Sequence, residues 1–175
     1  ISIFTPLSAP ELRPLQGSIR YSEKQVVRAE FHDVALLQLD RVVEDVHPLA
    51  WDESGEDLLG KLIYIAGYGD SAKGDISKER NWTKAELRRA AENVIDRDIR
   101  LDPFTKKPEG GLILFDFDNG KNERNSLNTK SRVWERIFGR GKSSATPTQL
   151  EGASYPGDSG GPAFAKIGDQ WRIVG

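Results

Sequence analysis

The sequence predicts a mostly β protein of 175 residues, long enough for one compact core or for two small subdomains packed together. Short apolar runs typical of buried strands recur along the chain, and Gly, Pro or Asp residues bound most of them. Only two segments, residues 83–95 and 131–138, carry the features of a helix. The chain shows no internal repeat and no low-complexity tract.

The N-terminal part predicts loops followed by strands. Residues 1–16 contain three prolines and little periodicity, which favours a surface arm. Residues 17–23 and 25–31 alternate moderately between polar and apolar, which predicts a hairpin. They lead into residues 34–39, a short apolar run of the buried-strand kind. Residues 46–49 contain a proline and predict a turn.

The middle of the chain predicts two clear strands and one ambiguous segment. Residues 61–66 predict a strand that stops at Gly67-Tyr68-Gly69. Residues 83–95 have apolar side chains at helical spacing and a composition that favours helix. Residues 112–117 predict a second clear strand. A long polar insertion follows.

The insertion covers residues 119–149, with one short helix expected at 131–138. Residues 116–120 resemble a calcium loop, but the glycine comes one position early and the required glutamate is missing, so we interpret them as a plain turn. The chain ends in a predicted hairpin, residues 162–167 and 170–174, with its turn at Gly168-Asp169.

The composition is that of an ordinary water-soluble chain. Apolar residues make up 37%, charged residues 30%, and the net charge is −2, so nothing favours nucleic acid or a membrane as a partner. No apolar run approaches the roughly 18 residues of a membrane span. The chain has no cysteine, which excludes disulfides, thiolate metal sites and a thiol nucleophile. We expect no cofactor and no metal.

One stretch carries the chemistry: Tyr155-Pro156-Gly157-Asp158-Ser159-Gly160-Gly161-Pro162. A serine flanked by glycines can sit on a tight turn with its hydroxyl exposed and its neighbouring amides pointing the same way. That geometry suits nucleophilic attack on a carbonyl group. The alternative is a plain loop, because Gly, Pro, Asp and Ser are also the commonest turn residues.

Four landmarks in the chain resemble the trypsin/chymotrypsin-like serine proteases. The GDSGGP string around Ser159 resembles their nucleophile loop, and residues 32–39 resemble the motif that carries the triad aspartate. Residues 67–69 resemble a later G-W-G motif, and residues 171–175 resemble the strand after the nucleophile. The landmarks occur in the family's order and cover the chain from about residue 31 to its end.

The resemblance implies a trypsin-like double six-stranded β-barrel, incomplete at both ends and interrupted by the polar insertion. Residues 1–175 would form a single partial peptidase domain, with residues 1–66 as the remainder of the N-terminal barrel and 67–175 as the C-terminal barrel. It also favours a strand over a helix at residues 83–95.

The resemblance assigns roles to individual residues. Ser159 would be the nucleophile, Asp33 would orient a histidine, and the amides of Gly157 and Ser159 would form the oxyanion hole. Ala153, six positions before the serine, and Ser154 would line the substrate pocket. Because Ala153 replaces the aspartate of trypsin-like enzymes, we expect no strong preference for basic side chains. Asp158 would be an ion-pair partner.

The catalytic base is the difficulty. His32 adjoins Asp33, so on an extended segment the two side chains point to opposite faces and cannot pair. His47 precedes a proline and is interpreted as a surface residue. Neither histidine sits in a motif like the one the family uses. We therefore expect that the sequence begins after the catalytic histidine of a longer protein.

The resulting hypothesis is a secreted or periplasmic serine endopeptidase that acts on protein or peptide substrates through an acyl-enzyme intermediate. The alternative is an inactive homologue that acts as a binding or regulatory module. The G-x-S-x-G pattern of α/β-hydrolases also fits Ser159, but no histidine follows it. A subtilisin-like order of Asp33, His47 and Ser159 is available, although the motifs around those residues do not match.

Overall fold

The computed structural model describes residues 23–29, 34–44, 46–71, 87–101, 108–128 and 139–175. These residues form antiparallel sheets joined by irregular chain, with one 3-10 turn, η2 (Asn122–Arg124). The prediction of a mostly β protein is therefore confirmed. The strands of the described ranges form three open sheets and close no barrel. None of the helical structure in those ranges is long and apolar enough to cross a bilayer.

The chain divides into two compact units, Pro6–Pro48 and a larger one that consists mainly of Leu49–Gly175. In the smaller unit β1 (Glu23–Ala29) pairs antiparallel with β2 (Val34–Leu39). The strand expected at residues 34–39 is thus confirmed. The predicted hairpin of residues 17–23 and 25–31 would have its turn near residue 24, which is wrong because that residue lies inside β1. The pairing of β1 with β2 shifts register between Glu23 and Gln25. The arm expected at residues 1–16 lies outside the described residues.

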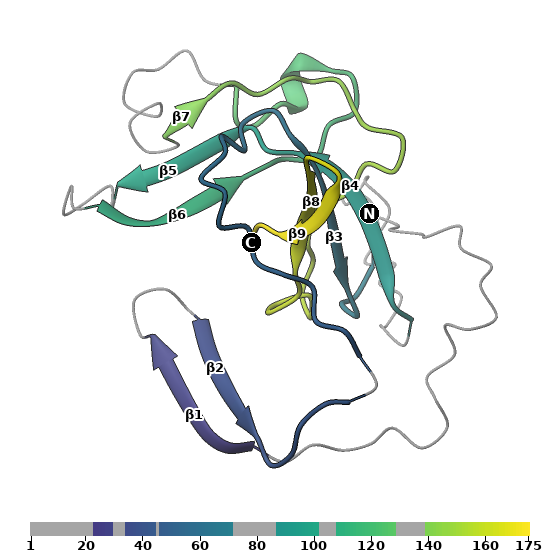
Figure 1. Cartoon of the computed structure of the whole chain (residues 1–175). Helices are drawn as coiled ribbons and strands as arrows, with labels where there is room; N and C mark the ends of the chain where they lie inside the picture. The colour runs from purple at the N-terminus through teal and green to yellow at the C-terminus, as the bar shows by residue number, and fades with distance from the viewer. Residues whose placement is uncertain (1–22, 30–33, 45, 72–86, 102–107, 129–138) are drawn as a thin grey trace. The chain divides into compact units, whose positions relative to one another are not determined.

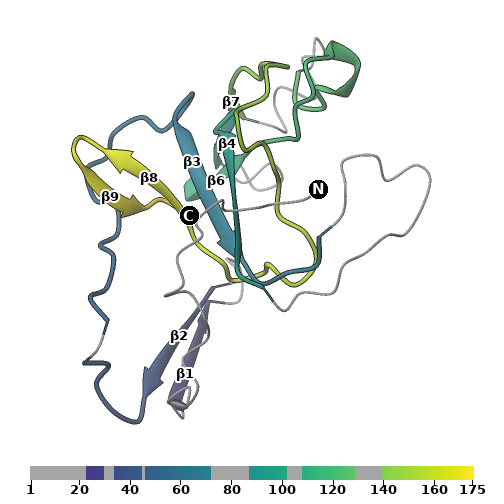
Figure 2. The ribbon, with the colours of Figure 1, turned by 90° about the vertical axis from the view of Figure 1, so that its right-hand side faces the viewer.

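The larger unit contains a four-stranded antiparallel sheet. Figure 1 and Figure 2 both show β8 lying between β3 and β9, and β4 completes the order β4-β3-β8-β9. The expected C-terminal hairpin and the strand expected at residues 61–66 are confirmed. In the ambiguous segment, residues 83–95, the strand that the resemblance favoured is confirmed where the chain is described, although the residue spacing and composition had favoured a helix; burial alternates along that strand with a period of two. The strands are β3 (Leu62–Gly67), β4 (Arg89–Val94), β8 (Ala163–Ile167) and β9 (Gln170–Ile173).

A second sheet of the larger unit has the order β6-β5-β7. Its strands are β5 (Arg97–Leu101), β6 (Pro108–Leu114) and β7 (Arg140–Gly141). The strand expected at residues 112–117 is present, but it starts earlier and ends at Leu114. The sequence did not predict β5 or β7. The short helix expected at residues 131–138 lies outside the described residues.

The core lies on one face of the four-stranded sheet. Ile63 and Ala165 are fully buried and oppose each other across β3 and β8, and Ile95 joins them. Ile113 of β6 packs against this cluster, so both sheets contribute to the core. Because side chains alternate along a strand, the other face of the sheet carries aromatic side chains. There Trp171 meets two rings edge to face, at centroid distances of 5.2 Å and 6.3 Å.

Candidate functional site

The serine loop, residues 155–162, connects a peripheral segment to β8. Two backbone hydrogen bonds fold it tightly: the Asp158 amide donates to the Tyr155 carbonyl at 3.0 Å, and the Gly161 amide donates to the Asp158 carbonyl at 2.8 Å. Gly157 and Gly160 adopt φ values of 95° and 81°, which other L residues rarely do. The glycines flanking Ser159 are therefore required by the backbone conformation of this loop.

The Asp158 carboxylate fixes the loop against the end of β3. One oxygen accepts a hydrogen bond from the Gly69 amide at 2.7 Å, and the other accepts from the Tyr155 amide at 2.9 Å. A Cβ at Gly67 or Gly69 would collide with this carboxylate. The glycines of the G-Y-G sequence, which begins at the last residue of β3, are thus explained by close approach of the serine loop. Both oxygens of Asp158 accept hydrogen bonds from backbone amides, and the ion pair expected for it in a complete protein stays a prediction.

Two amides of the loop are left without acceptors. Across the part of the chain that the structure describes, the amides of Gly157 and Ser159 donate no hydrogen bond. The Ser159 side chain is exposed, and its hydroxyl has no hydrogen-bond partner in the same described ranges. The loop therefore presents one hydroxyl and two amide donors to an outside group. These are the residues that the sequence assigned to the nucleophile and the oxyanion hole.

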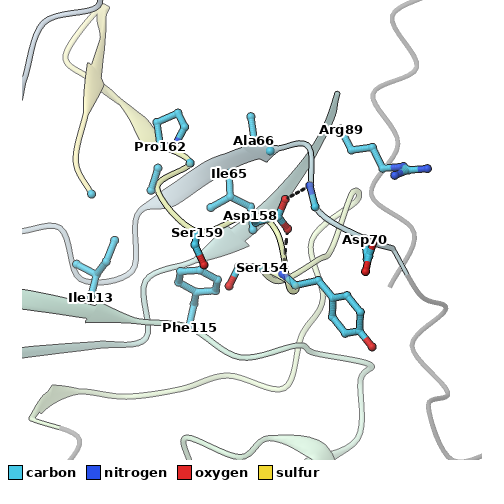
Figure 3. A pocket seen from close by; sticks show the side chains of 16 residues that line it. Ile65, Ala66, Asp70, Arg89, Ile113, Phe115, Ser154, Asp158, Ser159 and Pro162 are labelled. Atoms are coloured by element: carbon cyan, nitrogen blue, oxygen red, sulfur yellow. Dashed lines mark hydrogen bonds between the residues drawn. The ribbon is translucent and has the colours of Figure 1, made fainter. Parts of the chain in front are cut away.

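A pocket of about 300 Å³ opens beside Ser159. Figure 3 shows the Ser159 side chain and the Phe115 ring facing this pocket from the serine loop and from the chain after β6. Ile65 of β3 and Ala163 of β8 add apolar wall. Asp158 contributes a polar side chain to the lining of the pocket. The pocket thus combines apolar walls with a few convergent polar groups, the usual composition of a ligand site.

The other predicted site residues fall in different places. Ser154 is exposed and lines the pocket, whereas the half-buried Ala153 is not among the residues around it. Asp33 and His32 lie outside the described residues. His47 is exposed and belongs to the smaller unit. Both histidines precede Leu49, so the segment Leu49–Gly175 contributes no imidazole of its own.

A group of four largely buried acids, which we term the carboxylate cluster, is linked by hydrogen bonds and by mutual charge effects. Burial, with the charges of neighbouring acids, raises the pKa of Asp118 to about 7. Burial, followed by the charge of Asp116, raises the pKa of Asp96 to about 6, although hydrogen bonding from Ser143 offsets part of this. Within the described ranges no Lys or Arg forms an ion pair with the cluster. Its members are Asp96, Asp116, Asp118 and Glu151.

Hydrogen bonds satisfy most of the cluster. Asp116 accepts from the Ser126 hydroxyl at 2.8 Å and from the Leu127 amide at 3.0 Å, and Glu151 accepts from the Asp118 amide at 3.2 Å. One buried Asp118 oxygen has no partner within the described part of the chain. No group of three or more acidic, His or Cys side chains in that part is arranged to hold a metal ion. A neutral, protonated Asp118 is the arrangement that this environment favours.

Asn93 connects β4 to the segment that leads into the serine loop. Its side-chain amide is 1% exposed and donates to the Asp116 and Gly152 carbonyls, both at 2.8 Å, and to Glu151 at 3.0 Å. The sequence analysis assigned no role to Asn93 or to the carboxylate cluster. A buried asparagine within a strand was the available signal, together with the acids at positions 116 and 118 that were interpreted as a plain turn.

No protein-family model, curated protein or solved structure matches the chain. A function for it must therefore be derived from the serine loop and the pocket. Chemically, the arrangement offers an exposed hydroxyl, two hydrogen-bond donors for a developing oxyanion and an apolar surface for a substrate group.

Proposed function

We propose that this chain carries the nucleophile and the oxyanion-binding amides of a serine endopeptidase. The observation that carries the proposal is the exposed Ser159 hydroxyl at an apolar pocket, on a loop whose Gly157 and Ser159 amides have no acceptor among the described residues. The loop is held by the Asp158 carboxylate, so these donors are positioned before any substrate arrives.

The reaction proceeds in two steps. The Ser159 oxygen attacks the peptide carbonyl and forms a C–O bond while its proton passes to a base. The carbonyl oxygen becomes an oxyanion that accepts hydrogen bonds from the Gly157 and Ser159 amides, each of which typically stabilises the transition state by about 3 kcal/mol. The C–N bond breaks and the amine leaves with the proton, and water then hydrolyses the ester and restores Ser159.

The base in this proposal is a histidine oriented by Asp33. Neither His32 nor His47 lies in a motif like that of the trypsin-like family, so we expect the 175-residue chain alone to hydrolyse peptides several orders of magnitude more slowly than a complete enzyme. The proposal includes the trypsin-like two-barrel fold.

Labelling of the full-length protein with a fluorophosphonate tests the proposal. The probe forms an O–P bond with an activated serine while the P–F bond breaks and fluoride leaves, and the serine proton passes to the base. We expect the label on the peptide that contains Ser159 and its loss in Ser159→Ala. We expect its retention in Ser54→Ala, which alters an exposed serine that does not line the pocket. Mass spectrometry locates the label, and circular dichroism verifies that each variant is folded.

The second candidate function is a binding module without catalysis. It is favoured by one observation, the lack of any histidine in Leu49–Gly175. A folded full-length protein that takes up no fluorophosphonate would support this candidate and refute the endopeptidase. Peptide binding measured by fluorescence anisotropy would then be the expected remaining activity.

A further inference from the structure

The apolar wall beside Ser159 comes from the end of β6. Ile113 lies in β6 and Phe115 directly follows it, and both line the pocket. Both also pack against the buried cluster of Ile63, Ile95 and Ala165, which holds their side chains in place. Leu112, the residue before Ile113, is 60% exposed and does not line the pocket. Alternation along the chain therefore directs positions 113 and 115 toward the serine loop.

The position that the family resemblance assigns to the pocket floor does not contribute to this wall. Ala153 is half-buried and lies outside the set of pocket-lining residues. Ser154 lines the pocket but is exposed and offers only a hydroxyl. Neither residue can select a side chain by shape, so selection by shape falls to other lining residues.

The charged groups of the pocket are not placed to bind a basic side chain next to Ser159. Each oxygen of Asp158 already accepts a hydrogen bond from a backbone amide. Figure 3 shows Asp70 and Arg89 on the far side of Asp158 from Ser159, while Ile113 and Phe115 lie on the near side. A lysine side chain placed against the near wall would therefore lose its hydration without gaining a partner.

We propose that Ile113 and Phe115 determine the specificity of the site, and that they select an apolar side chain, such as that of leucine, at the residue whose carbonyl Ser159 attacks. This inference rests on the proposed endopeptidase function. Burying such a side chain against the wall favours leucine over lysine by about 10- to 100-fold in the rate of reaction with Ser159.

The test compares peptidyl diphenyl phosphonates that differ only in the residue next to phosphorus, either Leu, Ala or Lys, on the full-length protein. A simple alkyl fluorophosphonate, which carries no such side chain, reports the reactivity of Ser159 alone. We expect the Leu probe to label about 10-fold or more faster than the Lys probe. In Phe115→Ala the rate of the Leu probe, taken relative to the rate of the fluorophosphonate on the same variant, should fall about 10-fold.

Three further variants keep the test decisive. Leu112→Ala shortens the neighbouring exposed side chain and should leave all rates unchanged. If Phe115→Ala fails to fold, Ile113→Val and Phe115→Leu change the wall by smaller volumes, and they should shift the ratio of the Leu-probe rate to the Ala-probe rate.

The outcomes separate the two proposals. Fluorophosphonate labelling at Ser159 with equal rates for the Leu and Lys probes would overturn the specificity inference and leave the endopeptidase standing. The same holds if the wall variants leave the rate ratios unaltered. Absence of all labelling on folded protein would overturn the endopeptidase and, with it, the inference that depends on it.

Discussion

Replacing Asp118 by asparagine removes a buried acid whose charge the structure does not compensate. Its side chain is 6% exposed, one of its oxygens has no hydrogen-bond partner within the described residues, and its pKa is raised to about 7 by burial and by neighbouring acids. Because the pKa in the folded state lies above the ordinary value of 3.8, the folded state binds more protons than the unfolded state between these two values. The stability of the wild type should therefore fall as pH rises from about 4 to about 7 and then level off.

The size of the fall follows from the same two values. Each pH unit between 3.8 and about 7 lowers the free energy of unfolding by about 1.4 kcal/mol, so the contribution of Asp118 has an upper limit of about 4 kcal/mol. Water that enters the carboxylate cluster as Asp118 ionises reduces this destabilisation, so we expect ionised Asp118 to lower the free energy of unfolding by about 2–4 kcal/mol at pH 8. Asparagine has almost the same shape and no charge. Asp118→Asn should accordingly stabilise the protein by about this amount at pH 8 and change its stability by less than about 1 kcal/mol at pH 4.

Urea unfolding at pH 4, 6 and 8 measures this difference, with tryptophan fluorescence as the signal. Trp171, which contacts Tyr64 and Phe164, reports on the four-stranded sheet. The matched control is Asp169→Asn, which removes the same charge from the fully exposed hairpin turn and should leave the pH dependence intact. If Asp118→Asn and the wild type differ by the same amount at pH 4 and pH 8, the burial argument for Asp118 is wrong.

Two other substitutions test the contacts that hold the serine loop. In Gly69→Ala the new Cβ would lie 2.5 Å from an Asp158 oxygen, so we expect the free energy of unfolding to fall by about 2 kcal/mol or more. The control is Gly168→Ala, where the surroundings are open and we expect a loss of about 1 kcal/mol. Equal losses in the two variants would contradict the close approach of Asp158 to Gly69. Asn93→Leu removes the hydrogen-bond donor of the buried Gly152 carbonyl, and we expect it to lower the free energy of unfolding, measured with urea, by about 2–4 kcal/mol. A decrease below about 1 kcal/mol would show that this hydrogen bond is replaceable.

The sequence predicted those strands whose signal is local. The strands β2, β3 and β8 are short and mostly apolar runs, and such runs are readily recognised because a buried strand needs apolar side chains along most of its length. The strand β9 was recognised from the hairpin turn that precedes it. In contrast β5, Arg97–Leu101, has charged residues at three of its five positions, and its alternation is limited to Ile99 and Leu101. Its strand conformation depends on pairing with β6 and β7. So short an alternation is a weak local signal.

The same distinction applies to the site. Ser159 was recognised because the residues that shape its loop are its immediate neighbours. The carboxylate cluster was missed because desolvation is a property of the folded chain, and its members come from residues 96 to 151. Likewise, Phe115 joined the pocket only through the arrangement of the two sheets, so the sequence offered Ala153 in its place.

The order of strands in the central sheet has a consequence for synthesis in the cell. β3 pairs with β8, and Gly69 and Asp158 are joined across 89 residues of sequence. Since ribosomes release the N-terminal part first, β3 lacks β8 as a partner until almost the whole unit has emerged, although β4 and Ile95 become available earlier. Nascent chains would thus leave one edge of β3 unpaired for most of translation and form the Ser159 loop last, which makes this protein a candidate client of ribosome-associated chaperones.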